Sequence, residues 1–163
     1  MAKNKEEKTN VMRVLEQKKI AYTAHTYPHE EGVAVDGVTV AKSMGFDPAI
    51  VFKTLVARGA SKQYYVFDVP VAENLDLKKA AKAVGEKSIE MIHQKELLPL
   101  TGYVHGGCSP VGMKKLFPTV FHSSAENLAA MIVSAGKIGY QVKLAPHDLA
   151  ALVRAKFADI IVE

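Results

Sequence analysis

Lys53 interrupts an otherwise apolar segment, IVFKTLVARG at positions 50–59. The segment has the length and side chains of a strand, in which Lys53 shares its face with apolar neighbours. Because an unpaired ammonium is costly to bury, this position needs an explanation. Two interpretations stay open. Lys53 either guards an edge strand and reaches water, or sits at the rim of a cavity and binds a phosphate, a carboxylate or a polarised carbonyl.

The loop GGCSP at positions 106–110 is the second unusual segment. The paired glycines Gly106 and Gly107 allow the backbone to approach a ligand closely and to aim N–H groups at an anion or carbonyl oxygen. A plain turn has the same composition, so that interpretation stays open too. The chain has neither GxGxxG nor GxxxxGK[ST], which argues against a nucleotide-phosphate loop.

Cys108, the single cysteine, has two interpretations. It could act as a nucleophile with His105 or His122 as base, or it could be a small buried apolar side chain. No spacing ties it to either histidine. The six histidines are scattered without the spacing of metal ligands, so we predict no metal site and no cofactor.

The composition is that of a globular protein of one domain: 163 residues, 48% hydrophobic and 23% charged. We expect a charged, disordered tail at 1–8 and one domain at 9–163. No apolar run reaches the roughly 20 residues of a membrane span, and the N-terminus lacks a secretory core, so we expect a cytoplasmic protein without a membrane partner. The net charge of +4 permits a nucleic-acid partner without requiring one.

The elements that must position these residues alternate irregularly between strand and helix. Asn10 is expected to cap a helix to Lys19, and Asp76 a helix at 77–84 that ends at Gly85. Two hairpins are expected, at 50–57 with 64–71 and at 132–134 with 140–144. Further strands are expected at 20–27, 88–92 and 119–122, and a short element at 157–162. Further helices are expected at 94–98 and 147–154, together with one that ends at Gly45 and one that begins at the capping box 123–126. This order predicts an α/β fold: a single compact domain with a central mixed sheet flanked by helices.

Five motifs occur in order over nearly the whole chain, from about Val11 to Ile160: VFKTLV, PVAENLDLKKAAKAVG, TGYVHGGCSPVGMKK, IVSAGKIGYQVKLAPHDL and AKFADI. Together they resemble the YbaK/EbsC family, free-standing relatives of the editing domain of bacterial prolyl-tRNA synthetases. The resemblance implies the YbaK/aminoacyl-tRNA synthetase-associated domain fold. It also implies removal of cysteine from Cys-tRNA(Pro), with Cys-tRNA(Cys) as a further substrate.

The resemblance also implies a set of site residues. Lys53 is the expected catalytic residue; the expected substrate-binding residues are Tyr27, Thr54, Gly106, Gly107, Ser109 and Ser134. Two positions depart from the family pattern. Cys108 stands where the family usually has isoleucine, and Gln141 stands where it commonly has aspartate.

The implied chemistry is substrate-assisted: the thiol of the esterified cysteine attacks its own carbonyl, so the protein mainly orients the ester and supplies charge. Lys53 would hold a phosphate or the ribose, or stabilise negative charge, and the N–H groups of Gly106 and Gly107 would polarise the carbonyl. Cys108 would be a bystander. A prolyl site needs such a second check because a small difference in side-chain size is worth only about 1–3 kcal/mol.

The expected partners are aminoacyl-tRNA, with tRNA(Pro) foremost, and prolyl-tRNA synthetase, since no anticodon-reading module is apparent. The sequence leaves the oligomeric state open. Two other functions stay open as well: a deacylase for another small amino acid, such as Ala-tRNA(Pro), in which water attacks, or a non-catalytic module that binds aminoacyl-tRNA or a synthetase.

Overall fold

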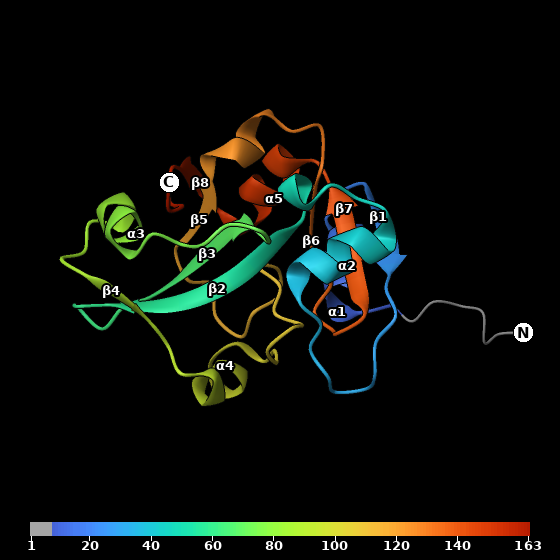
Figure 1. Cartoon of the computed structure of the whole chain (residues 1–163), viewed down its shortest axis with the longest axis horizontal. Coiled ribbons are helices and arrows are strands. Elements are labelled where there is room, and N and C mark those ends of the chain that lie inside the picture. Colours follow the sequence, from blue (N-terminus) through green and yellow to red (C-terminus); the bar gives the residue numbers. More distant parts are fainter. Residues whose placement is uncertain (1–7) are drawn as a thin grey trace, which may run out of the picture.

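A computed structural model describes residues 8–163 and places the strands in two sheets that share one junction (Figure 1). The smaller sheet has the order β1 (Tyr22–Thr26), β7 (Tyr140–Leu144), β6 (Met131–Ser134), all antiparallel. The larger has the order β4 (Ile89–Met91), β2 (Phe52–Gly59), β3 (Tyr64–Pro70), β5 (Thr119–His122), β8 (Lys156–Ala158). It is mixed, because β5 pairs in parallel with both β3 and β8. The predicted α/β domain with a mixed sheet is confirmed, with two sheets in place of one.

Within residues 8–163, five α-helices and two 3₁₀ turns precede or connect these strands. They are α1 (Asn10–Gln17), α2 (Gly37–Met44), η2 (Pro48–Ile50), α3 (Leu77–Val84), α4 (Gln94–Thr101), η3 (Ser123–Asn127) and α5 (Pro146–Val153). Each described α-helix has eight residues, far short of the roughly 20 that cross a bilayer, and between residues 8 and 163 no helix qualifies as a membrane span. Apart from Lys8, the expected tail at 1–8 lies outside the described residues.

Two predicted helix starts are wrong. Thr9, not Asn10, caps α1: its backbone is extended and its side chain accepts a hydrogen bond from the N–H of Met12. The predicted capping box at Ser123 does not form, because His122 occupies the N-cap position without a side-chain bond and the segment is only a 3₁₀ turn.

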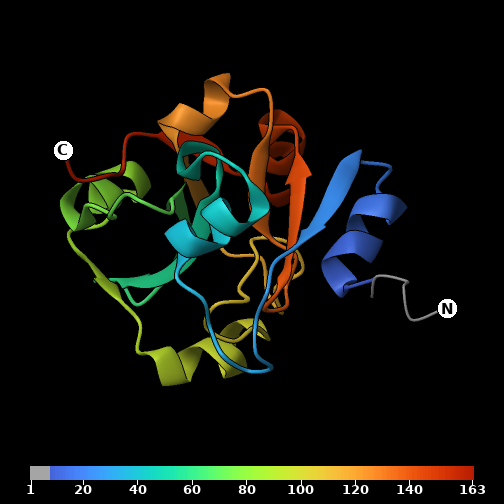
Figure 2. The same ribbon diagram turned by 45° about the vertical axis from the view of Figure 1, so that its right-hand side comes forward.

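The smaller sheet is covered on both faces, by α1 on one side and α2 on the other (Figure 2). Alternation along β6 explains this arrangement. Val133 joins the core cluster that contains Leu15 of α1, whereas Ile132 joins the cluster that contains Ala41 of α2. A parallel bridge between Val51 and Ile132 then joins this sheet to the start of β2.

The larger sheet also has two buried faces. Phe67 and Val69 of β3 belong to the cluster with Ala80 of α3, while Val66 belongs to the main core with Phe52. Since alternate residues share a face, Asp68 points toward the main core.

One edge of β2 is left open in the middle of the molecule. β3 pairs with β2 from Phe52 to Arg58, but β4 pairs only with Ala57–Gly59 on the other side. The part of β2 between the bridge at Val51 and Ala57 therefore lacks a strand on that side among residues 8–163. Lys53 lies in this open part.

Candidate active site

A cavity of about 360 Å³ lies where the open edge of β2 meets three loops. Its wall is formed by Ala34, Val35, Asp36, Gly37, Phe52, Lys53, Thr54, Leu55, Val71, Leu97, His105, Gly106, Cys108 and Ser134. Consecutive residues of β2 contribute because the cavity wraps around an edge that none of the described strands covers. Its volume lies within the range of sites for small ligands, about 300–1,000 Å³.

Lys53 provides the cationic group of this cavity. The side chain is half-buried and has no ion pair within 4.0 Å in the described part of the chain. Burial lowers the pKa of Lys53, and attraction to Asp36 and Glu73 opposes that shift. Both interpretations of the sequence are therefore partly right: Lys53 lies on an open edge, and its charge faces a cavity that also contains Gly106.

Asp36 lies in the same wall, although it was not among the predicted site residues. Its side chain caps α2, accepting hydrogen bonds from the N–H and the hydroxyl of Thr39, both at 3.1 Å. The next residue, Gly37, lies so close to Val71 that an added Cβ would be 2.7 Å from the valine Cβ. The capping signal of Asp36 could have located the start of α2, but only the fold brings this loop to Lys53.

The glycine loop forms another part of the wall and makes two close backbone contacts. Gly106 has φ +91°, and a Cβ there would lie 2.7 Å from that of Ala34; one at Gly107 would lie 3.0 Å from the N of Ile138. The N–H of Gly107 donates to the carbonyl of Val104 at 2.9 Å, so it is not free to polarise a substrate carbonyl as predicted. Gly106 lines the cavity, and within residues 8–163 its N–H has no acceptor.

Two hydroxyls complete the polar part of the wall. Thr54 donates to Oδ1 of the buried Asp68 at 2.5 Å, and Ser134 accepts from the N–H of Gly136 at 3.1 Å. The cavity thus combines the ammonium of Lys53, the hydroxyls of Thr54 and Ser134 and the N–H of Gly106 with the carboxyl group of Asp36, the imidazole ring of His105, the thiol of Cys108 and apolar side chains. This set suits a small polar ligand with an ester or carboxyl group.

Comparison with known proteins identifies the family. Residues 32–152 match the model of the aminoacyl-tRNA editing domain, and this range contains the whole cavity wall. The chain belongs to the aminoacyl-tRNA editing domain family. A relative from Enterococcus faecalis, provisionally named Cys-tRNA(Pro)/Cys-tRNA(Cys) deacylase EbsC, is 45% identical over 161 residues, or 98% of each chain. The predicted resemblance to the YbaK/EbsC proteins is confirmed.

Solved structures show the same editing-domain fold. One, described provisionally as a trans-editing enzyme for prolyl tRNA synthetase, has a TM-score of 0.79 at 24% identity, covering 94% of this chain and 95% of the other. Another, the hypothetical protein APE2540, has a TM-score of 0.82 at 18% identity, covering 93% and 99%. At these identities the likeness establishes the fold.

Three of the predicted substrate-binding residues of this editing domain do not line the cavity: Tyr27, Gly107 and Ser109. Tyr27 is 4% exposed, and burial raises its pKa. Ser109 is fully buried, and its hydroxyl accepts from the N–H of Val111 at 3.2 Å, which shapes the glycine loop. Direct contacts of these residues with substrate stay predictions. Lys53, Thr54, Gly106 and Ser134 are brought together as expected.

Cys108 forms part of the cavity wall but is a poor nucleophile. Burial, reinforced by the nearby Asp68, raises the pKa of its thiol to about 12, so the thiol keeps its proton at neutral pH. Among the candidate bases, His105 lines the cavity, whereas His122 accepts a hydrogen bond from the N–H of Ile160 through Nδ1 at 3.3 Å.

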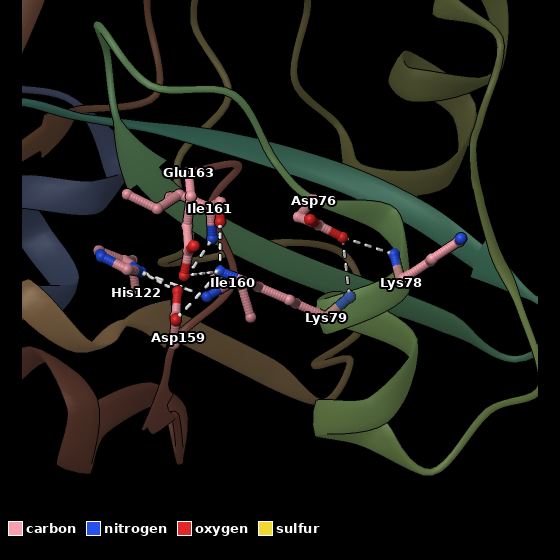
Figure 3. A network of polar contacts seen from close by, with 8 residues as sticks. All are labelled: Asp76, Lys78, Lys79, His122, Asp159, Ile160, Ile161 and Glu163. Carbon is pink, nitrogen blue, oxygen red and sulfur yellow. Dashed lines mark hydrogen bonds and ion pairs between the residues drawn. The ribbon is translucent and has the colours of Figure 1, made fainter.

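Figure 3 shows His122 within a polar network that fastens the C-terminal segment to α3. Lys79 donates to Asp159 at 3.1 Å, to Glu163 at 3.3 Å and to the carbonyl of Ile161 at 2.9 Å. His122 therefore has a structural role, and Lys79 is engaged within the chain. Between residues 8 and 163 no three histidine, cysteine, aspartate or glutamate side chains gather as metal ligands do.

Proposed function

We propose that this protein removes cysteine from mischarged proline tRNA, Cys-tRNA(Pro), as a deacylase that acts in trans. The observation that carries this proposal is the half-buried ammonium of Lys53, without an ion pair in residues 8–163, in the wall of the same small, mostly apolar cavity as Gly106. The 45% identical relative, named for the same substrates, supports it over nearly the full length.

In this proposal the substrate supplies the nucleophile. The thiol of the esterified cysteine attacks its own carbonyl carbon, so an S–C bond forms and the C–O bond to the ribose breaks. The ribose oxygen takes up the proton that the thiol released, and water then opens the cyclic thioester to give cysteine. Because the thiol is already tethered to the carbonyl, it acts at a very high effective concentration.

The protein supplies orientation and positive charge. Lys53 stabilises the oxygen that becomes negative during attack, or holds the phosphate next to the ester, and partial burial strengthens either interaction. The N–H of Gly106, which has no acceptor within residues 8–163, is a backbone donor in the same wall. Thr54 and Ser134 contact the aminoacyl group and the ribose. Protonated Cys108 does not compete with the substrate thiol.

Selection of the tRNA body requires more surface than this cavity offers. We infer that prolyl-tRNA synthetase is the partner that presents Cys-tRNA(Pro), and that the protein works in the cytoplasm, where aminoacyl-tRNA is used. Co-purification of a ternary complex with synthetase and tRNA would support this. Equal activity on isolated Cys-tRNA(Pro) and Cys-tRNA(Cys), with and without synthetase, would contradict it.

The decisive experiment compares release from four esters of tRNA(Pro): cysteinyl, S-methylcysteinyl, alanyl and prolyl. Rapid release from the cysteinyl ester alone supports attack by the substrate thiol. Equal release from the S-methylcysteinyl or alanyl ester would show that water attacks, which favours the broader deacylase. Binding of all four without release would identify a non-catalytic module.

A further inference from the structure

Asp68 carries a buried carboxyl group whose hydrogen bonding is incomplete. Its exposed fraction is 0%, and it lies directly opposite Thr54 in the antiparallel register of β3 and β2. Oδ1 accepts a hydrogen bond from the Thr54 hydroxyl, while Oδ2 has no partner within the described residues. A buried polar atom without a partner is costly and uncommon in folded proteins. A purely structural role would be served better by an apolar side chain.

The surroundings of Asp68 contain no cation that compensates its charge. Thr54 on β2 bonds to it, Cys108 on the glycine loop is coupled to it electrostatically, and Phe121 lies opposite it on β5. No lysine, arginine or histidine forms an ion pair with it in residues 8–163. The carboxyl group thus reaches the cavity only through the Thr54 hydroxyl, which lines the wall.

We propose that Asp68 is a positioning residue that acts through Thr54 to bind the α-ammonium group of the aminoacyl ester. This inference rests on the proposed function. A hydroxyl has one hydrogen and two lone pairs. An ionised carboxylate only accepts, so Thr54 must donate its hydrogen to Asp68 and turn a lone pair toward the cavity. There it accepts from the ammonium, and the buried negative charge behind it favours a cation over a neutral donor.

The test uses two esters of tRNA(Pro) that differ only in the amino group. The cysteinyl ester has it, whereas the 3-mercaptopropionyl ester keeps the thiol and the ester but lacks the amino group. The wild-type protein is expected to prefer the cysteinyl ester. Asp68→Asn and Thr54→Val should each reduce this preference about 10- to 100-fold in kcat/KM, as expected for a hydrogen bond to a charged group. Thr54→Ser keeps the hydroxyl and should keep the preference.

Thr119→Val is the matched control. Thr119 is 4% exposed on β5, and its hydroxyl donates to the carbonyl of Phe117 at 2.8 Å, away from the cavity. The Thr119→Val variant should lose stability but keep the wild-type preference for the cysteinyl ester over the 3-mercaptopropionyl ester. The double variant of Asp68 and Thr54 should lose no more preference than either single variant, because the two act as one unit.

The outcomes separate the two proposals. If the wild-type protein releases no cysteine, the proposed function fails and this inference fails with it. If the wild-type protein is active but Asp68→Asn and Thr54→Val slow both esters equally, Asp68 has only a structural role and the inference is overturned. If Asp68→Asn does not fold, Thr54→Val alone decides by the same criterion.

Discussion

Ser134 and Gln141 lie opposite each other in the antiparallel register of β6 and β7. Ser134 lines the cavity, and Gln141 is 6% exposed with an Oε1 that has no partner among the described residues. The pair therefore repeats the arrangement of Thr54 and Asp68. Each cavity hydroxyl thus has a cross-strand neighbour with a buried oxygen that lacks a partner among residues 8–163.

Gln141→Met removes this oxygen and keeps the size of the side chain. Because a buried unpaired acceptor is destabilising, the free energy of unfolding should stay the same or rise by up to about 1 kcal/mol. Cysteine release should fall several-fold, since the polar neighbour of Ser134 is lost. Urea unfolding and a deacylation assay measure the two effects. Loss of stability with normal activity would show that the amide is already satisfied and unrelated to the site.

Lys53→Ala should reduce kcat/KM for cysteine release by about 100-fold or more, because it removes the ammonium that faces the ester. Stability should not fall, since a half-buried charge without an ion pair is removed. Steady-state kinetics and thermal unfolding measure these effects.

Two other variants serve as controls for Lys53. Lys78→Ala, on the exposed side of α3, should stay within about threefold of wild type, as expected for a solvated surface lysine. Cys108→Ala should also keep most of the activity, because the thiol is protonated. Loss of release in Cys108→Ala with normal release in Lys53→Ala would reverse the assigned roles.

The local elements could be predicted well from the sequence. The predicted helix at 77–84, with Asp76 as cap and Gly85 as its end, is confirmed, because cap chemistry is encoded within a few residues. The hairpins at 50–71 and 132–144 also form, since alternating apolar runs and short glycine turns specify them locally. A lysine within an apolar run marked Lys53 as unusual but left two interpretations open, and the family resemblance selected it as the expected catalytic residue.

The long-range arrangement could not be predicted in the same way. Asp68 interrupts YYVFDVP as clearly as Lys53 interrupts its own strand, but its partner Thr54 depends on the hairpin register. The parallel pairing of β3 with β5 joins segments about fifty residues apart, and no local pattern encodes it. Likewise, the internal bond of the Gly107 N–H follows from the shape of the loop, not from its composition.

Gly106→Ala tests the close approach of the glycine loop to the cavity. A Cβ there would lie 2.7 Å from the Cβ of Ala34, and φ is +91°. We expect a loss of about 1–3 kcal/mol in stability, and a large loss of cysteine release because the cavity wall shifts. Gly85→Ala is the control: it has φ +74° but nothing within 4 Å, so it should lose stability and keep its activity. Similar activity in both variants would argue against a role for this wall.

The buried Asp68 should also make stability depend on pH. Burial raises its pKa from the ordinary value of 3.8 to about 7, against a smaller opposing effect of the bond from Thr54. Between these values the folded protein holds a proton that the unfolded chain releases. The contribution of Asp68 protonation to the free energy of unfolding is therefore fully present below about pH 4. It is lost as the pH rises through 7, and the total loss is up to about 4 kcal/mol.

Asp68→Asn, which does not titrate, should therefore gain stability relative to wild type between pH 4.5 and pH 8. Chemical denaturation at several pH values measures this difference. Asp159→Asn is a control of opposite sign, because the hydrogen bond from Lys79 lowers the pKa of the exposed Asp159. The wild-type protein should gain stability over that variant as the pH rises through the lowered pKa. The proposed action through Thr54 uses the ionised form of Asp68, which predominates above about pH 7. A difference in stability between wild type and Asp68→Asn that does not change with pH would contradict the raised pKa of this carboxyl group.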